Sequence, residues 1–429
     1  MKNQNYLSDV KAQYEHLPYP PVNPQDEYRR LQRTWLEDLP MMNHYCYGGR
    51  QDFRDGFRIL VAGGGTGDAT IFLAEQLRAT NAEIVHLDLS AASIALAQQR
   101  AAIRKLGNIR WVQDSLLNLP ELGLGHFDYI NCSGVLHHLA DPDAGLRALK
   151  SVLAPGGALG LMLYGAVGRV GVYHMQQLLR LGNAGCSEGQ KIAQAKEVLA
   201  ALPAGNWYRR AGELYGDNDT DAGIFDSLLH SQDRAYTIEE LHAWLGDGHG
   251  FHLELSDVNR GRFPYLPEYT LAIEARQLRE RLPAMSERAR HAMSELLMGD
   301  ITRHTFYLTA GPQARAPYGQ ADTIPFFFHE PLDPKALETM FAPKNGKLTV
   351  LGHPHLGLRA AVDAGEYAGA ILGLIDGKRS FGEIFDLVRA RTGAGQAAPD
   401  DAALFAGFQP TYDLLNAIER LLLRHVSCR

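Results

Sequence analysis

The sequence predicts an α/β protein built on a doubly wound, mostly parallel sheet. Apolar runs that can form strands alternate with stretches of helical periodicity from residue 57 to residue 163, as in successive βαβ units. A cluster of glycines, GGGTG at residues 63–67, directly follows the first apolar run. The turn APGG at residues 154–157 ends one helical stretch and begins another strand, which is the role of a glycine-rich connection.

The strands and helices of this region are predicted in strict alternation. Each strand is a short apolar run, and each helix carries its apolar residues on one side. We predict strands near residues 58–62, 83–87, 109–113, 127–133 and 157–163, and helices near residues 67–79, 90–106 and 142–153. Two further strand-like runs, at residues 251–258 and 304–310, complete a predicted sheet of seven strands.

The chain is predicted to have three parts. Residues 1–56 contain several prolines that break helices and are expected to form an N-terminal lid or cap. Residues 57–312 form the sheet domain, in which residues 165–250 lose the alternation and predict a helical insertion. After a linker rich in Gly, Pro, Ala and Gln, residues 321–429 predict a small accessory domain of α/β or winged-helix-like type. Additional helices are predicted near residues 26–39, 364–375, 380–391 and 410–425.

Composition and charge limit the classes of function. The chain has 429 residues, a formal net charge of -7 and a pI near 6.2, which makes nucleic acid an unfavoured partner. The four cysteines are scattered without a CxxC pair and predict free thiols in a reducing compartment. The N-terminal residues lack the apolar core of a signal peptide, and no run approaches the roughly 18 apolar residues of a membrane helix. We therefore expect a cytoplasmic protein without a membrane partner.

The glycine cluster and the next strand have the layout of a nucleotide-binding βαβ unit. Glycines at a strand end let the backbone turn sharply and approach a ligand, and the second strand ends in Asp88, an acid placed to bind a ribose diol. The turn lacks the GK[ST] residues that anchor a triphosphate. Its GxGxG spacing is tighter than the GxGxxG suited to a pyrophosphate, and this favours a nucleotide that carries an amino acid instead.

Five motifs in order resemble those of class I S-adenosylmethionine-dependent methyltransferases. They are LVAGGGTG at residues 60–67, Asp88 in HLDLS, Asp114 in WVQDS, the strand FDYINCSGVLHHL and the turn LAPGG. The resemblance implies a Rossmann-like seven-stranded sheet and S-adenosyl-L-methionine as cofactor. It implies that Asp88 accepts both ribose hydroxyls and that Asp114 with the Ser115 amide reads the adenine. The residues that it implies in cofactor binding are Gly63, Gly64, Gly65, Gly67, Asp88, Leu89, Asp114, Ser115, Ser133 and, at the methionine carboxylate, Arg50.

One position departs from the pattern of this family. Most relatives carry an acid two residues before the first motif glycine, where this chain has Val61. The resemblance therefore supplies no carboxylate near the amino group of the methionine. Asp68, just after the glycines, and a backbone carbonyl are the two replacements that the sequence leaves open.

The strand ends beside the glycine turn carry the candidate catalytic residues. Methyl transfer is an in-line displacement, so alignment of the reactants supplies most of the rate. We expect His138 and Tyr164 to position the acceptor, and a role of His137 or His138 as a base stays open because histidine titrates near neutrality. We also expect His137 to contact the acceptor. Shorter matches in YEHLPYPPVNP and LLHSQDRAYTIEEL imply that further residues face it: Tyr14, Tyr19, His230, Asp233, Arg234 and Tyr236.

These residues do not determine the acceptor. Since no NPPY-like strand end is present, DNA is disfavoured, and we expect a nitrogen or oxygen nucleophile on a small molecule or on a peptide or protein side chain. A cofactor-binding scaffold without catalysis, whose C-terminal domain docks a partner, and an RNA methyltransferase are the alternatives; a homodimer is left open. The pair His353 and His355 has no carboxylate or cysteine at ligand spacing, so we predict no metal.

Overall fold

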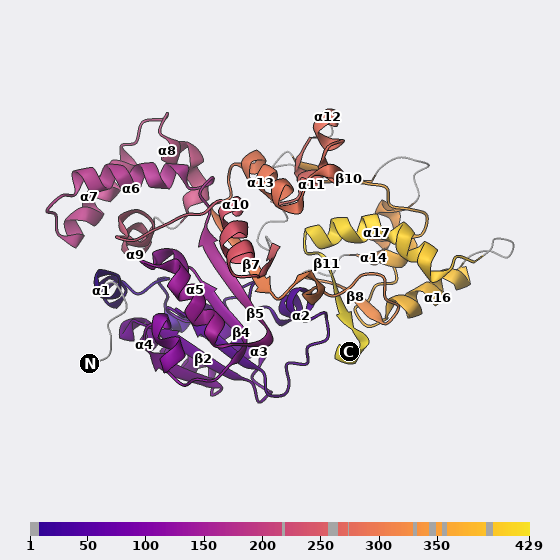
Figure 1. The fold of residues 1–429 in the computed structure, drawn as a ribbon, viewed down its shortest axis with the longest axis horizontal. Helices are drawn as coiled ribbons and strands as arrows, with labels where there is room; N and C mark the ends of the chain where they lie inside the picture. The colour runs from indigo at the N-terminus through magenta and orange to yellow at the C-terminus, as the bar shows by residue number, and fades with distance from the viewer. Residues whose placement is uncertain are drawn as a thin grey trace. The chain divides into compact units, whose positions relative to one another are not determined.

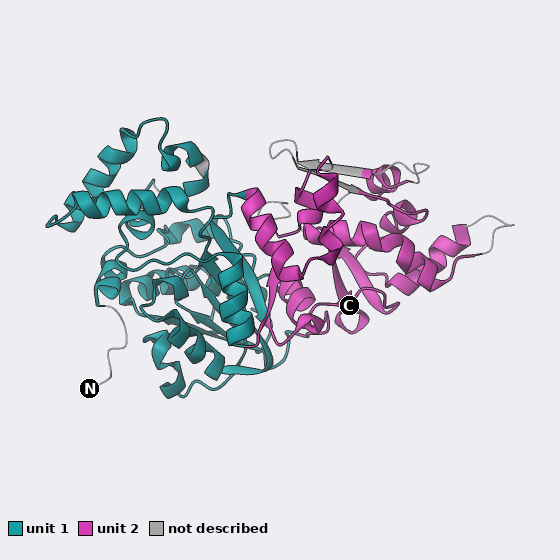
Figure 2. Ribbon diagram, turned by 45° about the horizontal axis from the view of Figure 1, so that its top comes forward, with its two compact units in different colours: residues 1–38, 53–249, 299–308 teal, residues 39–52, 250–298, 309–429 magenta. Residues whose placement is uncertain are grey.

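The chain divides into two compact units, which Figure 2 shows in different colours. The computed structural model describes residues 8–216, 219–255, 265–272, 274–328, 333–342, 349–353, 358–391 and 398–429. Unit 1 comprises residues 1–38, 53–249 and 299–308, and unit 2 comprises residues 39–52, 250–298 and 309–429. Unit 2 thus groups two earlier segments of the chain with the C-terminal region, a grouping that the three predicted ranges do not contain.

A seven-stranded, mostly parallel sheet organises the fold (Figure 1), as the sequence predicts. The strand order is β3-β2-β1-β4-β5-β7-β6. The pairs from β3 to β5 are parallel, whereas β7 runs antiparallel to β5. The strands are β1 (Arg58–Ala62), β2 (Glu83–Asp88), β3 (Ile109–Gln113), β4 (Phe127–Ser133), β5 (Leu153–Tyr164), β6 (His252–Leu255) and β7 (Arg303–Thr309). This order confirms the Rossmann-like methyltransferase sheet.

Crossover helices connect the parallel strands, and side-chain caps start two of them. Ser90 accepts a hydrogen bond from the Ser93 amide at the start of α4 (Ala91–Arg104), and Asp141 caps α5 (Pro142–Ser151) in the same way. The first crossover helix is α3 (Asp68–Gln76). Each connection returns the chain to the end of the sheet where the previous strand began, so β1 to β5 run parallel. Their carboxyl ends therefore share one edge, where open α/β sheets bind ligands.

The N-terminal segment does not form the helix predicted at residues 26–39. Its regular elements in unit 1 are α1 (Ser8–His16) and the 3-10 turn η1 (Pro24–Tyr28). The end of the segment is instead held by the sheet domain: the Tyr129 hydroxyl donates to the Leu36 carbonyl at 2.7 Å, and the Gln76 side-chain amide donates to the Glu37 carbonyl at 2.8 Å. The prediction was wrong because contacts with the sheet outweigh local helical propensity.

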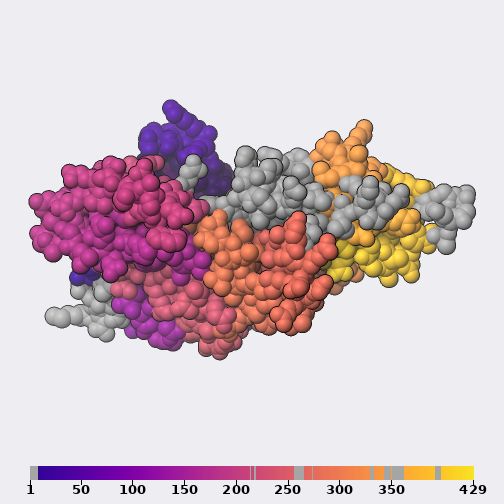
Figure 3. All heavy atoms as spheres, turned by 90° about the horizontal axis from the view of Figure 1, so that it is seen from above, coloured from indigo at the N-terminus to yellow at the C-terminus, as the bar shows by residue number. Residues whose placement is uncertain are grey.

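Helices form the region after β5. Its α-helices are α6 (Val170–Gly182), α7 (Glu188–Ala200), α8 (Trp207–Ala211), α9 (Asp221–Ile224) and α10 (Ile238–Leu241), with π-helical turns η5 (Phe225–Leu229) and η6 (His242–Gly248). Figure 3 shows side chains of this region, in magenta, as a continuous part of the surface. They enclose a small core of their own: Val172, Met175, Leu179, Ala195, Leu202, Tyr208, Ile224 and Leu228.

Unit 2 joins helices to two small antiparallel sheets, β8 with β11 and β9 with β10. A segment from early in the chain is tied in by His44, whose Nδ1 accepts the Leu423 amide at 2.9 Å. The elements are α2 (Leu39–Cys46), α11 (Pro267–Thr270), α12 (Arg276–Arg279), α13 (Glu287–Met298), β8 (Thr323–Phe327), α14 (Pro334–Met340), β9 (Thr349–His353), β10 (Leu358–Val362), α15 (Ala368–Leu372), α16 (Phe381–Arg391), α17 (Asp401–Ala417) and β11 (Leu421–His425).

The helix predicted at residues 410–425 is wrong over its second half. Helix α17 ends at Ala417, Glu419 has a φ of 54°, and the apolar run from Leu421 becomes strand β11. A short apolar run fits a buried strand as well as a helix, and pairing with β8 decides between them. No described helix combines the length and apolar character needed to cross a membrane.

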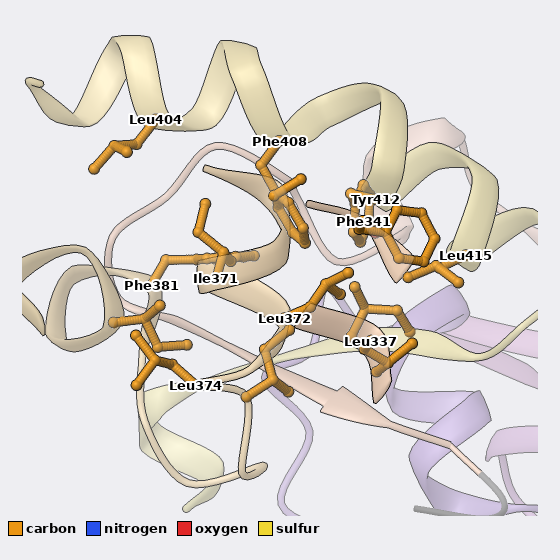
Figure 4. Packing of buried hydrophobic residues seen from close by; sticks show 14 of the residues in the cluster. Leu337, Phe341, Ile371, Leu372, Leu374, Phe381, Leu404, Phe408, Tyr412 and Leu415 are labelled. Atoms are coloured by element: carbon orange, nitrogen blue, oxygen red, sulfur yellow. The ribbon is translucent and has the colours of Figure 1, made fainter. Parts of the chain in front are cut away.

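Aliphatic and aromatic side chains fill the core of unit 2 (Figure 4). Phe408 of α17 is fully buried in it, and Phe381 of α16 lies with its ring centroid 6.1 Å from that of Phe408. Because protein interiors are close-packed, truncation of a buried side chain here leaves a cavity. The core is therefore the main source of stability of this unit.

Phe408→Ala should lower the free energy of unfolding by about 3–5 kcal/mol, because the lost ring contacts leave a cavity. Chemical denaturation monitored by circular dichroism measures the change. Leu387→Ala on α16 is the control, since Leu387 is 39% exposed and a surface truncation should cost under about 0.5 kcal/mol. Equal effects of the two substitutions would contradict the assignment of the core.

Candidate cofactor and acceptor site

The glycine turn after β1 forms a cradle that side chains would fill. The amides of Gly63 and Gly64 donate to the Leu87 carbonyl at 2.8 and 3.1 Å, which ties the turn to the end of β2. Gly65 has a φ of 52°, and a Cβ there would lie 2.6 Å from the Tyr19 carbonyl oxygen. The turn therefore requires glycine, both for its left-handed backbone and for close approach.

Asp88 stands at the end of β2 with its carboxylate fixed beside this turn. One carboxylate oxygen accepts the Gly65 amide and the other accepts the Ser90 amide, each at 2.8 Å. Burial raises the pKa of Asp88, although these amides favour the charged form. The result is an oriented carboxylate at the sheet edge, which suits a ribose diol.

The next strand ends lie at the same edge. The Asp114 amide donates to the Asp88 carbonyl at 3.1 Å. One oxygen of the Asp114 carboxylate accepts the Ser115 amide at 2.8 Å and the Asn118 side chain at 2.7 Å. Ser133 is exposed at the end of β4. These residues and the glycine turn thus fit an adenosine that runs across the ends of β1, β2 and β3.

The N-terminal segment lies over the glycine turn and the start of α4. Glu15 accepts the Ala91 and Ala92 amides at 2.9 and 3.0 Å, a favourable position for a carboxylate at a helix N-terminus. Burial opposes its charge, but these amides lower the pKa of Glu15. The Thr66 hydroxyl donates to the Pro20 carbonyl at 2.8 Å. Residues 14–20 therefore cover the cradle directly.

A buried carboxylate from this segment bonds to the strand next to the position where the family motif has an acid and this chain has Val61. Asn131 on β4 is the register partner of Val61, so the two side chains share a face of the sheet. The Asn131 amide donates to Glu37, which is 3% exposed. Burial raises the pKa of Glu37 to about 7, and the charge of Asp68 adds to the effect. Glu37 could not be predicted from the sequence, because it lies far from the motif along the chain.

Asp68, the replacement that the sequence left open, belongs to a structural network. Arg100 is 3% exposed and donates to Asp68 at 2.7 Å, to Glu27 at 2.7 Å and to the Thr66 carbonyl at 2.8 Å. A buried guanidinium of this kind needs such partners. The network fixes the start of α3 against α4 and the N-terminal segment.

A polar cluster surrounds Asp226, which is 3% exposed in the helical region after β5. The Tyr14 hydroxyl donates to one oxygen of the Asp226 carboxylate at 2.9 Å, and the Tyr164 hydroxyl donates to the other at 3.1 Å. His138 and His230 stack with their ring centroids 3.9 Å apart. We call Tyr14, His138, Tyr164, Asp226 and His230 the acceptor cluster. Four of its members were predicted to face the acceptor; Asp226, two residues before the quoted LLHSQDR segment, was not.

The hydrogen bonds of the two histidines define their tautomers. His138 Nδ1 lies 2.8 Å from the Gln232 carbonyl oxygen, which can only accept, so neutral His138 carries its hydrogen on Nδ1 and a lone pair on Nε2. The Gln232 amide donates to His230 Nδ1 at 3.0 Å, so neutral His230 carries its hydrogen on Nε2. Burial lowers the pKa of His230 to about 2, which keeps that ring neutral.

His137 and Arg169 fix the ring of Tyr164 from its two faces. His137 stacks on Tyr164 with centroids 3.9 Å apart, and the Arg169 guanidinium lies 3.6 Å from the ring centroid. Neither ring nitrogen of His137 has a hydrogen-bond partner in the part of the chain that the structure describes. Burial holds the pKa of His137 well below its usual value. Tyr164 thus presents only its hydroxyl to the acceptor cluster.

Other predicted residues have surroundings of their own. Arg50 belongs to unit 2 and is exposed. Arg234 is exposed and lies over Tyr236, which stacks on Trp244 with centroids 5.3 Å apart. Asp233 accepts from Tyr173 at 3.1 Å and Gln176 at 2.7 Å. The roles predicted for these residues remain predictions, as does that of Tyr19, whose carbonyl approaches Gly65.

A metal ion does not fit the acceptor cluster as it stands. Ligand atoms of His138, Asp226 and His230 lie within 4.8 Å of one another. The lone pair of an imidazole nitrogen lies in the ring plane, yet the two rings stack at only 24°, so their lone pairs do not converge on one point. His355 of the predicted HxH pair lies outside the described residues. The predicted absence of a metal stays a prediction.

Comparison with known proteins identifies the family. The profile of a methyltransferase domain family matches residues 60–159, which contain the glycine turn, Asp88 and Asp114. A demethylmenaquinone methyltransferase of Thermus thermophilus is 35% identical over 162 residues, which is 34% of this chain and 72% of that protein. The chain belongs to the class I S-adenosylmethionine-dependent methyltransferases. It is an S-adenosylmethionine-dependent enzyme, and the cradle described above fits that cofactor.

Two other relatives of this methyltransferase extend over most of its length. An uncharacterized protein of Synechococcus is 35% identical over 321 residues, 73% of this chain and 74% of its own. The structure of PKMT2 from Rickettsia typhi in complex with AdoHcy has a TM-score of 0.62 at 15% identity and covers 95% of this chain and 77% of that one. At this identity the second likeness concerns the fold alone.

Asp88→Ala should weaken binding of S-adenosylhomocysteine at least about 100-fold, because each charge-assisted hydrogen bond to the ribose contributes about 1.5–3 kcal/mol. Isothermal titration calorimetry measures the dissociation constant, and circular dichroism verifies the fold. Exposed Asp55→Asn is the control. An unchanged dissociation constant for Asp88→Ala would show that the ribose assignment is wrong.

Glu37→Gln should weaken S-adenosylhomocysteine binding about 10- to 100-fold, because it removes a charge-assisted hydrogen bond to the ammonium group. Binding of 5′-methylthioadenosine, which has no amino acid part, should not change. The raised pKa near 7 means that Glu37 gains its charge as the pH rises to about 7. Affinity for S-adenosylhomocysteine should therefore increase between about pH 5 and 7 in the natural enzyme and not in the variant. Equal losses for both ligands would exclude this role.

Proposed function

We propose that this enzyme methylates a nitrogen or oxygen nucleophile that binds at the acceptor cluster, on a small molecule or on a peptide or protein side chain. The observation that carries the proposal is the tautomer of His138. Its Nδ1 is held by the Gln232 carbonyl, so the Nε2 lone pair is available to a ligand. A nucleophile whose attacking lone pair is protonated, or a hydroxyl, must lose a proton before or during methyl transfer, and we assign its receipt to His138 Nε2.

The neighbours of His138 support this role. S-adenosylmethionine supplies an activated methyl group on a sulfonium. As the acceptor forms its bond to the methyl carbon and the carbon–sulfur bond breaks with its electrons on sulfur, the acceptor proton goes to His138 Nε2. Asp226 then stabilises the imidazolium by its negative charge, since the two side chains interact electrostatically. The Gln232 carbonyl keeps the ring oriented throughout.

Burial supports transfer to the bound acceptor rather than to water. His138 is 6% exposed, and the rings of His230 and Tyr164 lie against it. A site with few competing water molecules strengthens interactions with fixed dipoles and favours one aligned nucleophile. The cluster thus combines proton transfer with orientation.

Incubation of the enzyme with S-adenosylmethionine labelled on the methyl group and a fractionated cell extract tests the proposal. Label is expected on nitrogen or oxygen atoms in the small-molecule or protein fraction. Label in RNA would identify an RNA methyltransferase instead. Absence of label from every fraction, with cofactor binding confirmed by calorimetry, would overturn the proposal in favour of a scaffold.

His138→Gln should lower kcat with the labelled acceptor by about 10²–10⁴, the usual contribution of a positioned base. The dissociation constant of S-adenosylhomocysteine should stay the same. Exposed His126→Gln is the matched control. A change in the acceptor KM alone, with kcat and its pH profile unchanged, would assign His138 to acceptor binding rather than to proton transfer.

A further inference from the structure

We propose that the acceptor is an amine, recognised in its ammonium form by Asp226 and by the oxygen lone pairs of Tyr14 and Tyr164. This inference rests on the proposed function and names the chemical class of its substrate. It depends on three properties of the acceptor cluster: the direction of its hydrogen bonds, its charge and the rings that surround it.

The hydrogen bonds within the cluster leave several lone pairs that can accept hydrogen bonds from a ligand. Both tyrosine hydroxyls use their hydrogen to donate to Asp226. Burial, with the charge of Asp226, holds the pKa of both tyrosines well above its usual value, so neither loses that hydrogen near neutrality. His230 Nε2, which carries a hydrogen, lies 3.4 Å from the Tyr14 oxygen and can donate to one of its lone pairs. The other lone pair of Tyr14, the lone pairs of Tyr164 and that of His138 Nε2 remain to accept hydrogen bonds from a ligand. An ammonium group has three N–H donors and no acceptor, which matches this set.

The Asp226 carboxylate favours binding of a cationic ligand. Within the described part of the chain, no lysine or arginine forms an ion pair with Asp226. Arg169, the nearest guanidinium that influences it, lies 3.5 Å from Asp233 instead. His230 and His137 are kept neutral by burial. Burial raises the pKa of Asp226, and His138 is the neighbouring group that most opposes this rise. A buried carboxylate with so little positive charge around it is unfavourable, and a bound ammonium group would offset that cost while His138 is neutral.

The surrounding rings add to the attraction for a cation. His138 and His230 stack against each other, and Tyr14 lies with its ring centroid 6.0 Å from that of His230. Tyrosine faces attract ammonium groups through their quadrupole. Both faces of Tyr164 are covered, by His137 and Arg169, so this residue acts through its hydroxyl.

The same features disfavour other nucleophiles. A phenolate or carboxylate would face the like charge of Asp226. A neutral alcohol has one hydrogen to donate to a site with several acceptors. An ammonium group instead gives one proton to His138 Nε2, becomes a neutral amine with a free lone pair, and forms the bond to the methyl carbon. The methylated product then leaves as an ammonium ion.

The test uses the full-length enzyme saturated with S-adenosylhomocysteine and three probes of equal chain length: butylamine, 1-butanol and butyrate. Calorimetry at pH 7 should detect binding of butylamine at least tenfold tighter than that of either other probe. Asp226→Asn should remove this preference without changing the affinity for S-adenosylhomocysteine. Asp221→Asn, an exposed substitution of the same charge on α9, is the control and should keep the preference.

The other possible results contradict either the amine inference or the proposed function. Equal binding of the three probes, no binding of butylamine, or a preference that survives in Asp226→Asn would overturn the amine inference. Label found on hydroxyl oxygens in the extract assay would also overturn it, while methyl transfer to a nucleophile at the cluster would stand. If no fraction is labelled although the cofactor binds, the proposed function itself fails.

Discussion

The bond from the Gly65 amide to Asp88 is the interaction on which the site depends. It joins the turn after β1 to the end of β2, and the amides of Gly63 and Gly64 add two bonds to the Leu87 carbonyl. Parallel pairing of the strands brings these ends together, and the bond then fixes a carboxylate beside a backbone without side chains. The cofactor cradle thus follows from sheet topology and from one partly buried acid.

The cofactor half of the site could be predicted from the sequence because it is local. The glycine turn, Asp88 and Asp114 each lie at a strand end, and the alternation of strands and helices places those ends at one edge. The acceptor half could be predicted only in part. Tyr14, Tyr164 and Asp226 come from α1, β5 and η5, and no sequence pattern specifies that two hydroxyls meet one carboxylate across such distances.

Glu37 shows why the remaining parts were missed. Local propensity predicts a helix over residues 26–39, yet carbonyls of Leu36 and Glu37 are bonded to the sheet domain, and the chain there forms a turn. Propensity is a weak determinant where tertiary hydrogen bonds compete. The same competition turns the apolar run at Leu421 into a strand, because β8 offers it a partner.

The covering of the glycine turn by residues 14–20 bears on how the enzyme turns over. The Tyr19 carbonyl approaches Gly65, Pro20 holds Thr66, and Glu15 caps α4. Exchange of spent cofactor for fresh cofactor requires these contacts to break and form again in each cycle. If the cofactor binds in this cradle, release of the spent cofactor would depend on how readily residues 14–20 leave the glycine turn, so substitutions in that segment would act on product release and not on the chemical step.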